Sequence, residues 1–156
     1  MDIEAFVTAF GGIYEATPSI ARAAHATGPF ADRDAVLDAF AAAAAALDDD
    51  AVLALLRAHP QLGARGAMAA ASTSEQAGAG LRTISDEQRG ELDANNAAYL
   101  ARFGFPFIMA VRGLDRTEIG GRLRRRLGND PVEELATAFA EVQKIARLRL
   151  ESEISL

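Results

Sequence analysis

The chain has 156 residues, half of them hydrophobic, and a net charge of −6 at neutral pH. This length and apolar fraction predict one compact domain, residues 1–156, with a core large enough to be stable without covalent or metal staples. Cysteine is absent, which excludes disulfides, thiolate metal sites and a cysteine nucleophile. The net negative charge opposes non-specific binding to nucleic acid and to anionic membranes, so we expect neither as a partner.

Targeting signals are not evident in the sequence. The first twelve residues, MDIEAFVTAFGG, lack the cationic start and long apolar core of a secretion signal, and no apolar stretch is long enough to span a bilayer. The last three residues are Ile-Ser-Leu rather than the Ser-Lys-Leu of a peroxisomal signal. We therefore expect a soluble, cytoplasmic protein.

Helical spacing dominates the first part of the chain. Apolar residues at i, i+3, i+4 and i+7 predict a helix over residues 3–10, which two glycines end. Thr17 followed by Pro18 predicts a short helix to about residue 27, and Asp32 is placed to cap an alanine-rich helix through Leu47. A further helix is expected over residues 51–59.

The second part continues the helical pattern. Ser85 and Gln88 have capping-box spacing and predict a helix to about Phe103, ended by Gly104. Further helices are expected over residues 117–127 and from 131 to about 152. The apolar run FPFIMAV, residues 105–111, has no period that separates helix from strand. Because no strand alternation persists, the sequence predicts an all-α, single-domain helical bundle without internal repeats.

His59 is the first candidate for chemistry. Val52, Leu55 and Leu56 form an inward stripe on the helix over residues 51–59, and His59 is the next position of that series. Pro60 disfavours helical geometry at His59, so the imidazole should lie at a helix end, where free carbonyl groups favour its protonated form. The position suits a proton donor, and it equally suits a core histidine bonded to the backbone.

Glu75 and Arg149 are two further candidates. Glu75 follows Ser72 with capping-box spacing, so it either caps a helix or accepts a hydrogen bond from His59 or a substrate. In the last helix, Arg149 continues the series of positions expected to be buried, whereas Arg147 should face solvent. That series comprises Leu135, Ala138, Phe139, Val142, Ile145 and Ala146.

A buried guanidinium needs a compensating negative charge. Arg149 should therefore face either a structural carboxylate, for which Glu75 is a candidate, or an anionic ligand. The arginine-rich segment GRLRRRLG, residues 121–128, is interpreted as the solvated face of an amphipathic helix without a function.

Six segments of the sequence carry a family resemblance: YEATP (14–18), RAHPQLG (57–63), SEQAGAGL (74–81), RFGFPFIMAVRG (102–113), LGNDPVEEL (127–135) and IARLRLE (145–151). They resemble segments of the 2-oxo-4-hydroxy-4-carboxy-5-ureidoimidazoline (OHCU) decarboxylase family and occur in that family's order. The resemblance covers most of the chain, and FGFPFI together with EQAGAGL is its most specific part. Departures are Gln61, where the family often has Asp, and the small, uncharged character of much of the segment ARGAMAAAST, residues 64–73.

The resemblance implies an all-helical, usually dimeric enzyme of urate degradation that needs no cofactor or metal and forms (S)-allantoin and CO2. By position, His59 matches the family's catalytic histidine, Glu75 its motif glutamate and Arg149 its C-terminal arginine. The resemblance also implies substrate contacts, largely through backbone groups, at Pro60, Ser72, Thr73, Ser74, Gln76, Phe107, Ile108, Met109, Ala110 and Val111.

The implied chemistry accounts for the lack of a cofactor. Loss of CO2 from the hydroxyl-bearing carbon moves electrons into the adjacent ring C=N bond, so the substrate is its own electron sink. Arg149 would then hold or neutralise anionic charge, and His59 would take the hydroxyl proton or protonate the intermediate. Glu75 would orient His59 and the ureido group. Two alternatives stay open: an enzyme acting on another ureido acid of the urate pathway, and a helical interaction module without catalysis.

Overall fold

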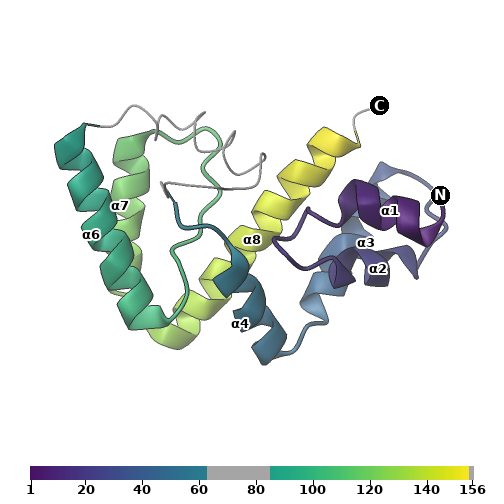
Figure 1. The fold of residues 1–156 in the computed structure, drawn as a ribbon, viewed down its shortest axis with the longest axis horizontal. Helices are drawn as coiled ribbons and strands as arrows, with labels where there is room; N and C mark the ends of the chain where they lie inside the picture. The colour runs from purple at the N-terminus through teal and green to yellow at the C-terminus, as the bar shows by residue number, and fades with distance from the viewer. Residues whose placement is uncertain (63–84, 155–156) are drawn as a thin grey trace. The chain divides into compact units, whose positions relative to one another are not determined.

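A computed structural model describes residues 1–62 and 85–154, and in these parts every regular element is a helix (Figure 1). The helices are α1 (Ile3–Phe10), α2 (Ser19–His25), α3 (Arg33–Ala45), α4 (Asp49–Ala58), α6 (Asp86–Phe103), α7 (Arg116–Arg126) and α8 (Pro131–Glu153). The expected all-α class is confirmed. The chain divides into two compact units, one of residues 1–58 with 142–156 and one of residues 59–141. The division means that α8 contributes to both units.

The first unit is built on short helices with local caps. Asp2 and Asp32 accept hydrogen bonds from the backbone of α1 and α3, each at 2.9 Å, which satisfies free N–H groups at both helix starts. Asp48 does the same for α4 at 2.8 Å, so this helix begins two residues earlier than expected. An aromatic cluster fills the core, with the Phe6 and Phe40 rings stacked 5.8 Å apart between centroids.

The second unit contains α6 and α7, which lie side by side in Figure 1 and contact each other. The capping box at the start of α6 is confirmed: Ser85 accepts from the Gln88 backbone at 3.2 Å and Gln88 from the Ser85 backbone at 3.0 Å. Gly104 ends α6 in the left-handed conformation with φ of 78°, which favours glycine. Residues 105–111 then run through the interior as neither helix nor strand.

The register of α8 agrees with expectation from Ala138 onward, except at Phe139. Ala138, Val142, Ile145, Ala146 and Arg149 are buried as expected. Near the start of the helix the expected positions Leu135 and Phe139 are only half-buried, and two glutamates, Glu134 and Glu141, are buried instead. The expectation failed there because a buried carboxylate with polar partners can take a place that an apolar pattern assigns to a neighbouring residue.

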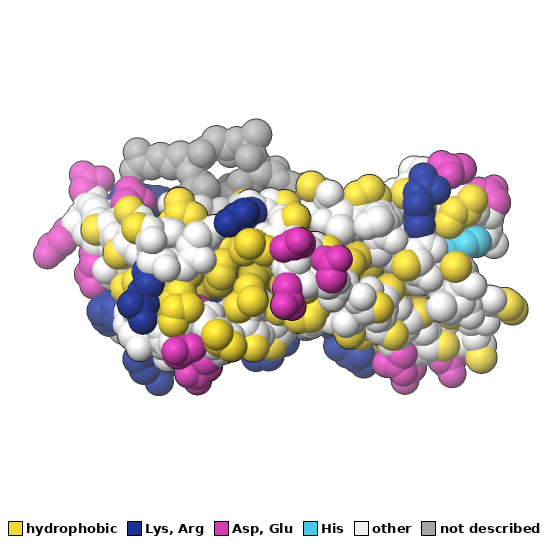
Figure 2. Space-filling view, turned by 90° about the horizontal axis from the view of Figure 1, so that it is seen from below, with side chains coloured by type: hydrophobic (Ala, Val, Ile, Leu, Met, Phe, Trp, Pro, Cys, Tyr) yellow, Lys and Arg dark blue, Asp and Glu magenta, His cyan; other side chains and the backbone are white. Residues whose placement is uncertain are grey.

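The exposed surface is mixed in character. On the face shown in Figure 2, acidic and basic side chains are interspersed with apolar ones. None of the helices in the described part of the chain combines the length and apolar character needed to cross a bilayer.

Candidate active site

His59 lies directly after the last residue of α4. The helix ends at Ala58, one residue before the expected end, as the geometry imposed by Pro60 requires. The His59 side chain is buried, with 8% of its surface exposed, so the prediction that it points inward is confirmed. Pro60 follows it half-buried.

The segment after His59 is attached to α6. The amide Nδ2 of Asn96, a fully buried residue, donates to the carbonyl oxygen of Leu62 at 2.9 Å. This bond fixes the main chain three residues beyond His59 to a long helix of the same unit. A buried hydrogen bond at this position limits the freedom of the segment that carries the imidazole.

Arg149 occupies the buried position on α8 that its register predicts. Its Nη1 donates to Oε1 of Glu15 at 3.1 Å and to the carbonyl oxygen of Ile13 at 3.2 Å. The Arg149 and Glu15 side chains are only 5% and 13% exposed. The carboxylate required by a buried guanidinium is therefore supplied by Glu15, which the sequence argument did not single out although it lies in the segment YEATP.

Neighbouring residues reinforce this arrangement within the first unit. The hydroxyl of Tyr14 donates to Oε1 of Gln143, which ties the YEATP segment to α8 a second time. Burial raises the pKa of the Tyr14 phenol above its ordinary value, so this hydroxyl keeps its proton and remains a donor. Arg147 is about half exposed and pairs with Glu151 at 3.3 Å, as expected for a solvated charge.

The apolar segment 105–111 is an irregular, buried strip of main chain. Phe107, Ile108, Met109 and Val111 are buried and Ala110 is half-buried. Because the segment forms neither a helix nor a strand, its peptide groups are not committed to a regular hydrogen-bond ladder. Such a strip offers main-chain groups for recognition of a polar ligand.

Arg126 corrects the interpretation of residues 121–128 as a solvated face. The Arg126 side chain is buried, and its Nη1 donates to the carbonyl oxygen of Ile108 at 2.6 Å. Its Nε pairs with Oε1 of Glu134 at 2.5 Å. Arg122, Arg124 and Arg125 are exposed, so the interpretation holds for them.

Glu134 is the centre of a buried polar network. Its Oε1 also accepts from the hydroxyl of Tyr99 at 2.5 Å, and its Oε2 accepts from Nδ2 of Asn129 at 2.9 Å. Burial, and then the hydrogen bond to Glu134, raise the pKa of the Tyr99 phenol above its ordinary value. The network is therefore a set of fixed donors around one carboxylate.

The remaining predicted site residues lie outside the described part of the chain. They are Ser72, Thr73, Ser74, Glu75 and Gln76, within residues 63–84. The expected roles of Glu75 as a helix cap, as a partner of Arg149 or as a catalytic group therefore stay predictions.

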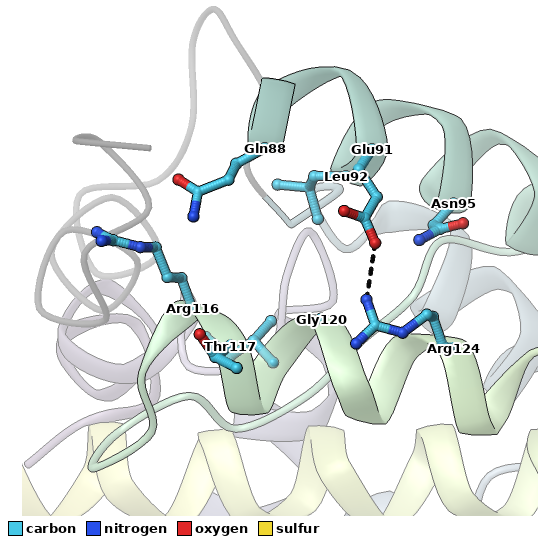
Figure 3. A pocket seen from close by; sticks show the side chains of 9 residues that line it. Gln88, Glu91, Leu92, Asn95, Arg116, Thr117, Gly120 and Arg124 are labelled. Carbon is cyan, nitrogen blue, oxygen red and sulfur yellow. Dashed lines mark hydrogen bonds and ion pairs between the residues drawn. The ribbon is translucent and has the colours of Figure 1, made fainter. Parts of the chain in front are cut away.

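A polar pocket of about 220 Å³ lies between α6 and α7 (Figure 3). Gln88 and Arg116 stand at one end of it, and Glu91 and Arg124 form an ion pair across it at 2.8 Å. The other lining residues are Leu92, Asn95, Thr117, Ile119 and Gly120. Among the described site residues, none of His59, Pro60, Arg149 or residues 107–111 lines this pocket. Within residues 1–62 and 85–154, no three metal-ligating side chains are grouped to hold an ion.

Sequence reasoning missed Glu15, Arg126 and Glu134, of which Arg126 and Glu134 had a usable signal. Ile119, Leu123 and Arg126 follow one another at i, i+4 and i+7, which is the spacing that singled out His59 and Arg149. Glu134 likewise precedes Ala138, Val142 and Ile145 at i+4, i+8 and i+11 on α8. Glu15 carries no such periodic signal, because it lies outside the helices and its partner Arg149 is on α8.

These features define a class of protein: a small all-α chain that keeps a histidine and two arginines inside, as enzyme sites often do. Comparison with known proteins is more specific. The family model for OHCU decarboxylase matches residues 1–151, and the chain therefore belongs to the OHCU decarboxylase family, whose members are decarboxylating enzymes.

Relatives of known sequence match over almost the whole chain. A putative OHCU decarboxylase of Homo sapiens is 43% identical over 96% of this chain and 89% of its own length. An OHCU decarboxylase of Haloferax volcanii is 40% identical over 99% of this chain and 92% of its own length.

Solved structures agree with these matches. An OHCU decarboxylase crystallised in the presence of (S)-allantoin superposes with a TM-score of 0.76 at 26% identity, covering 97% of both chains. An (S)-allantoin synthase superposes with a TM-score of 0.79 at 27% identity, covering 99% of this chain and 51% of that one. The all-α fold and the expected family are thus confirmed together.

Proposed function

We propose that this chain converts 2-oxo-4-hydroxy-4-carboxy-5-ureidoimidazoline into (S)-allantoin and CO2, as one decarboxylase domain spanning residues 1–156. The observation that carries the proposal is the family match over residues 1–151, which includes the segments of His59 and Arg149 and the apolar strip 105–111. The same match supports an enzyme over a helical interaction module.

The substrate determines what the protein has to supply. When the bond between the hydroxyl-bearing carbon and the carboxylate breaks, CO2 leaves and the electron pair forms a carbon–carbon double bond. The electrons of the adjacent C=N bond move onto the ring nitrogen, which takes a proton. The resulting enol returns to a ketone when a proton adds to the neighbouring carbon, and the face of that addition sets the S configuration. The protein therefore has to position, polarise and protonate.

The three charged or ionisable residues suit these tasks. A buried imidazole at a helix end, His59, is suited to take the hydroxyl proton or to protonate the intermediate. Arg149 is held by Glu15 and the Ile13 carbonyl, and it supplies the positive charge that stabilises the anionic substrate. Glu75 orients His59 and the ureido group in this mechanism.

Main-chain and polar groups complete the proposed substrate contacts. The resemblance assigns them to Pro60, to Ser72, Thr73, Ser74 and Gln76, and to the strip Phe107 to Val111. The irregular conformation of the strip supports a role for its backbone groups. We further propose that the protein is a cytoplasmic homodimer that works without metal or cofactor. Light scattering tests the dimer, and the metal-removal experiment below tests the independence from metal.

The test uses freshly generated product of urate oxidation. Spontaneous decay of this material gives racemic allantoin, so optical activity reports enzymatic decarboxylation directly. The proposal predicts rapid formation of the S enantiomer with release of one CO2. Spontaneous rates and a racemic product with folded protein would overturn it, and consumption of a different ureido acid would identify the alternative enzyme.

A further inference from the structure

Arg126 contacts the strip 105–111 in two ways. Its Nη1 donates to the carbonyl oxygen of Ile108 at 2.6 Å, and its guanidinium carbon lies 4.5 Å from the centroid of the Phe107 ring. One side chain thus restrains a main-chain oxygen and the neighbouring ring. Both contacts fall at the start of the segment 107–111, which is proposed to meet the substrate.

The guanidinium is itself held rigidly. Its Nε pairs with Glu134, which is fully buried, and the carboxylate of Glu134 also accepts from Tyr99 and Asn129. Because these donors come from α6, from α7 and from the residues before α8, the position of Arg126 is determined by several elements at once. A charge-assisted bond from such an anchored donor restrains its acceptor more than a bond from a free side chain.

Core stability alone does not explain an arginine at this position. Arg126 continues the buried series of Ile119 and Leu123, where an apolar side chain would fill the same space. A buried ion pair is often no more stabilising than a well-packed apolar replacement, because both charges lose their hydration. What an apolar side chain cannot do is bind Glu134 and the Ile108 carbonyl at the same time.

We propose that Arg126 is a positioning residue for the decarboxylation: it fixes the peptide between Phe107 and Val111 so that its backbone groups meet the substrate in one geometry. The inference rests on the proposed function. It adds a residue that acts through the main chain of the strip and touches no reacting atom.

The decisive variant is Arg126→Lys, which keeps the charge but has a single donor group and loses the planar fork. We expect KM to rise about tenfold, the effect of losing one charged hydrogen bond, with a smaller change in kcat. Arg125→Lys on the exposed side of α7 is the matched control and should leave both constants unchanged. Tyr99→Phe removes one donor to Glu134 and a long 3.4 Å acceptor of Arg126 Nη2, but it leaves the bond to Ile108, so it should lower stability with little change in KM.

A second readout does not depend on turnover. Hydrogen exchange of the peptide covering residues 105–111 should accelerate in Arg126→Lys and stay as in the wild type in Arg125→Lys. Equal KM values for Arg126→Lys and Tyr99→Phe at matched stability, or unchanged exchange in Arg126→Lys, would overturn the positioning role. Absence of decarboxylation in the wild-type protein would instead overturn the proposed function. The exchange experiment would still test whether Arg126 restrains residues 105–111, because it does not depend on turnover.

Discussion

Arg149 and Glu15 are 134 positions apart in sequence and are joined by a hydrogen-bonded ion pair of 3.1 Å in the interior of one unit. Their side chains are 5% and 13% exposed, so water screens the pair very little. Removing one partner of such a pair is more destabilising than breaking a solvated pair, because water cannot replace the lost partner of the buried charge that remains.

We therefore expect Glu15→Ala to lower the free energy of unfolding by about 3 kcal/mol, as measured by urea denaturation. The matched control is Glu4→Ala, because Glu4 pairs with Arg22 at 2.9 Å on the surface. Breaking this exposed pair should cost less than about 1 kcal/mol. Similar losses in the two variants would show that the Glu15 pair contributes no more than a surface pair.

The role of Arg149 toward substrate is tested by a second comparison. Arg149→Lys keeps the charge but loses the planar guanidinium, whose Nη1 bonds both Ile13 and Glu15, so kcat/KM should fall about tenfold or more. Arg147→Lys, in the exposed position two residues earlier, should change it less than about twofold. Equal effects of the two substitutions on kcat/KM would show that Arg149 has no specific role toward the substrate.

His59→Asn tests proton transfer. The substitution keeps similar bulk in the buried position but removes the ionisable ring, so decarboxylation should slow by about a hundredfold or more. Circular dichroism and the unfolding midpoint establish whether the variant is folded. A folded variant with nearly normal kcat would show that His59 is a structural core residue.

The two tyrosines provide a pH prediction with a defined sign. Burial raises the pKa of both phenols, so below pH 10 the folded and unfolded chains carry the same phenol protons. Above pH 10 the unfolded chain loses phenol protons that the folded chain keeps. Stability should therefore fall as pH rises, by about 1.4 kcal/mol per pH unit for each tyrosine.

The measurement is simple because the chain has two tyrosines and no tryptophan. Phenolate absorbance near 295 nm should stay low in the folded protein above pH 10 and appear together with unfolding. Tyr99→Phe should remove about half of that absorbance change. Ordinary titration of both phenols at about pH 10 while the helical signal persists would contradict the prediction.

Metal removal should leave activity intact. The chain offers two histidines and no cysteine as nitrogen or sulfur ligands, and the substrate provides its own electron sink. The protein should be treated with EDTA, separated from the chelator and assayed in metal-free buffer. Activity that is lost and then restored by one specific divalent ion would overturn the cofactor-free mechanism.

Local signals explain which features the sequence could predict. Helix starts at Asp32 and Ser85 were predictable because the capping side chain and its N–H partner are three residues apart. The buried positions of His59 and Arg149 were predictable because each continues an apolar series, that of the preceding helix α4 for His59 and that of α8 for Arg149.

The partners of these buried charges were not predictable in the same way. The partner of Arg149, Glu15, is selected by a tertiary contact to α8 that no local spacing encodes. Glu134 has the spacing of a buried position on α8, but its partners Tyr99 and Arg126 lie on α6 and α7. The conformation of residues 105–111 could not be predicted either, because a continuous apolar run has no hydrophobic periodicity that distinguishes helix from strand. The buried position of Arg126 could have been predicted from its helical spacing. It was missed because the neighbouring arginines led to the interpretation of the whole segment as solvated.

The composition of the first unit from residues 1–58 and 142–156 has a consequence for synthesis on the ribosome. Glu15 is made early, but its partner Arg149 follows 149 − 15 = 134 residues later. At about 5–20 residues per second, this corresponds to roughly 7 to 27 seconds of translation. During that interval the nascent chain holds a carboxylate and an apolar surface whose covering helix does not yet exist, whereas residues 59–141 form a continuous stretch. The order of emergence therefore favours completion of the sequence-continuous unit first and closure of the N-terminal unit last, when the end of α8 leaves the ribosome.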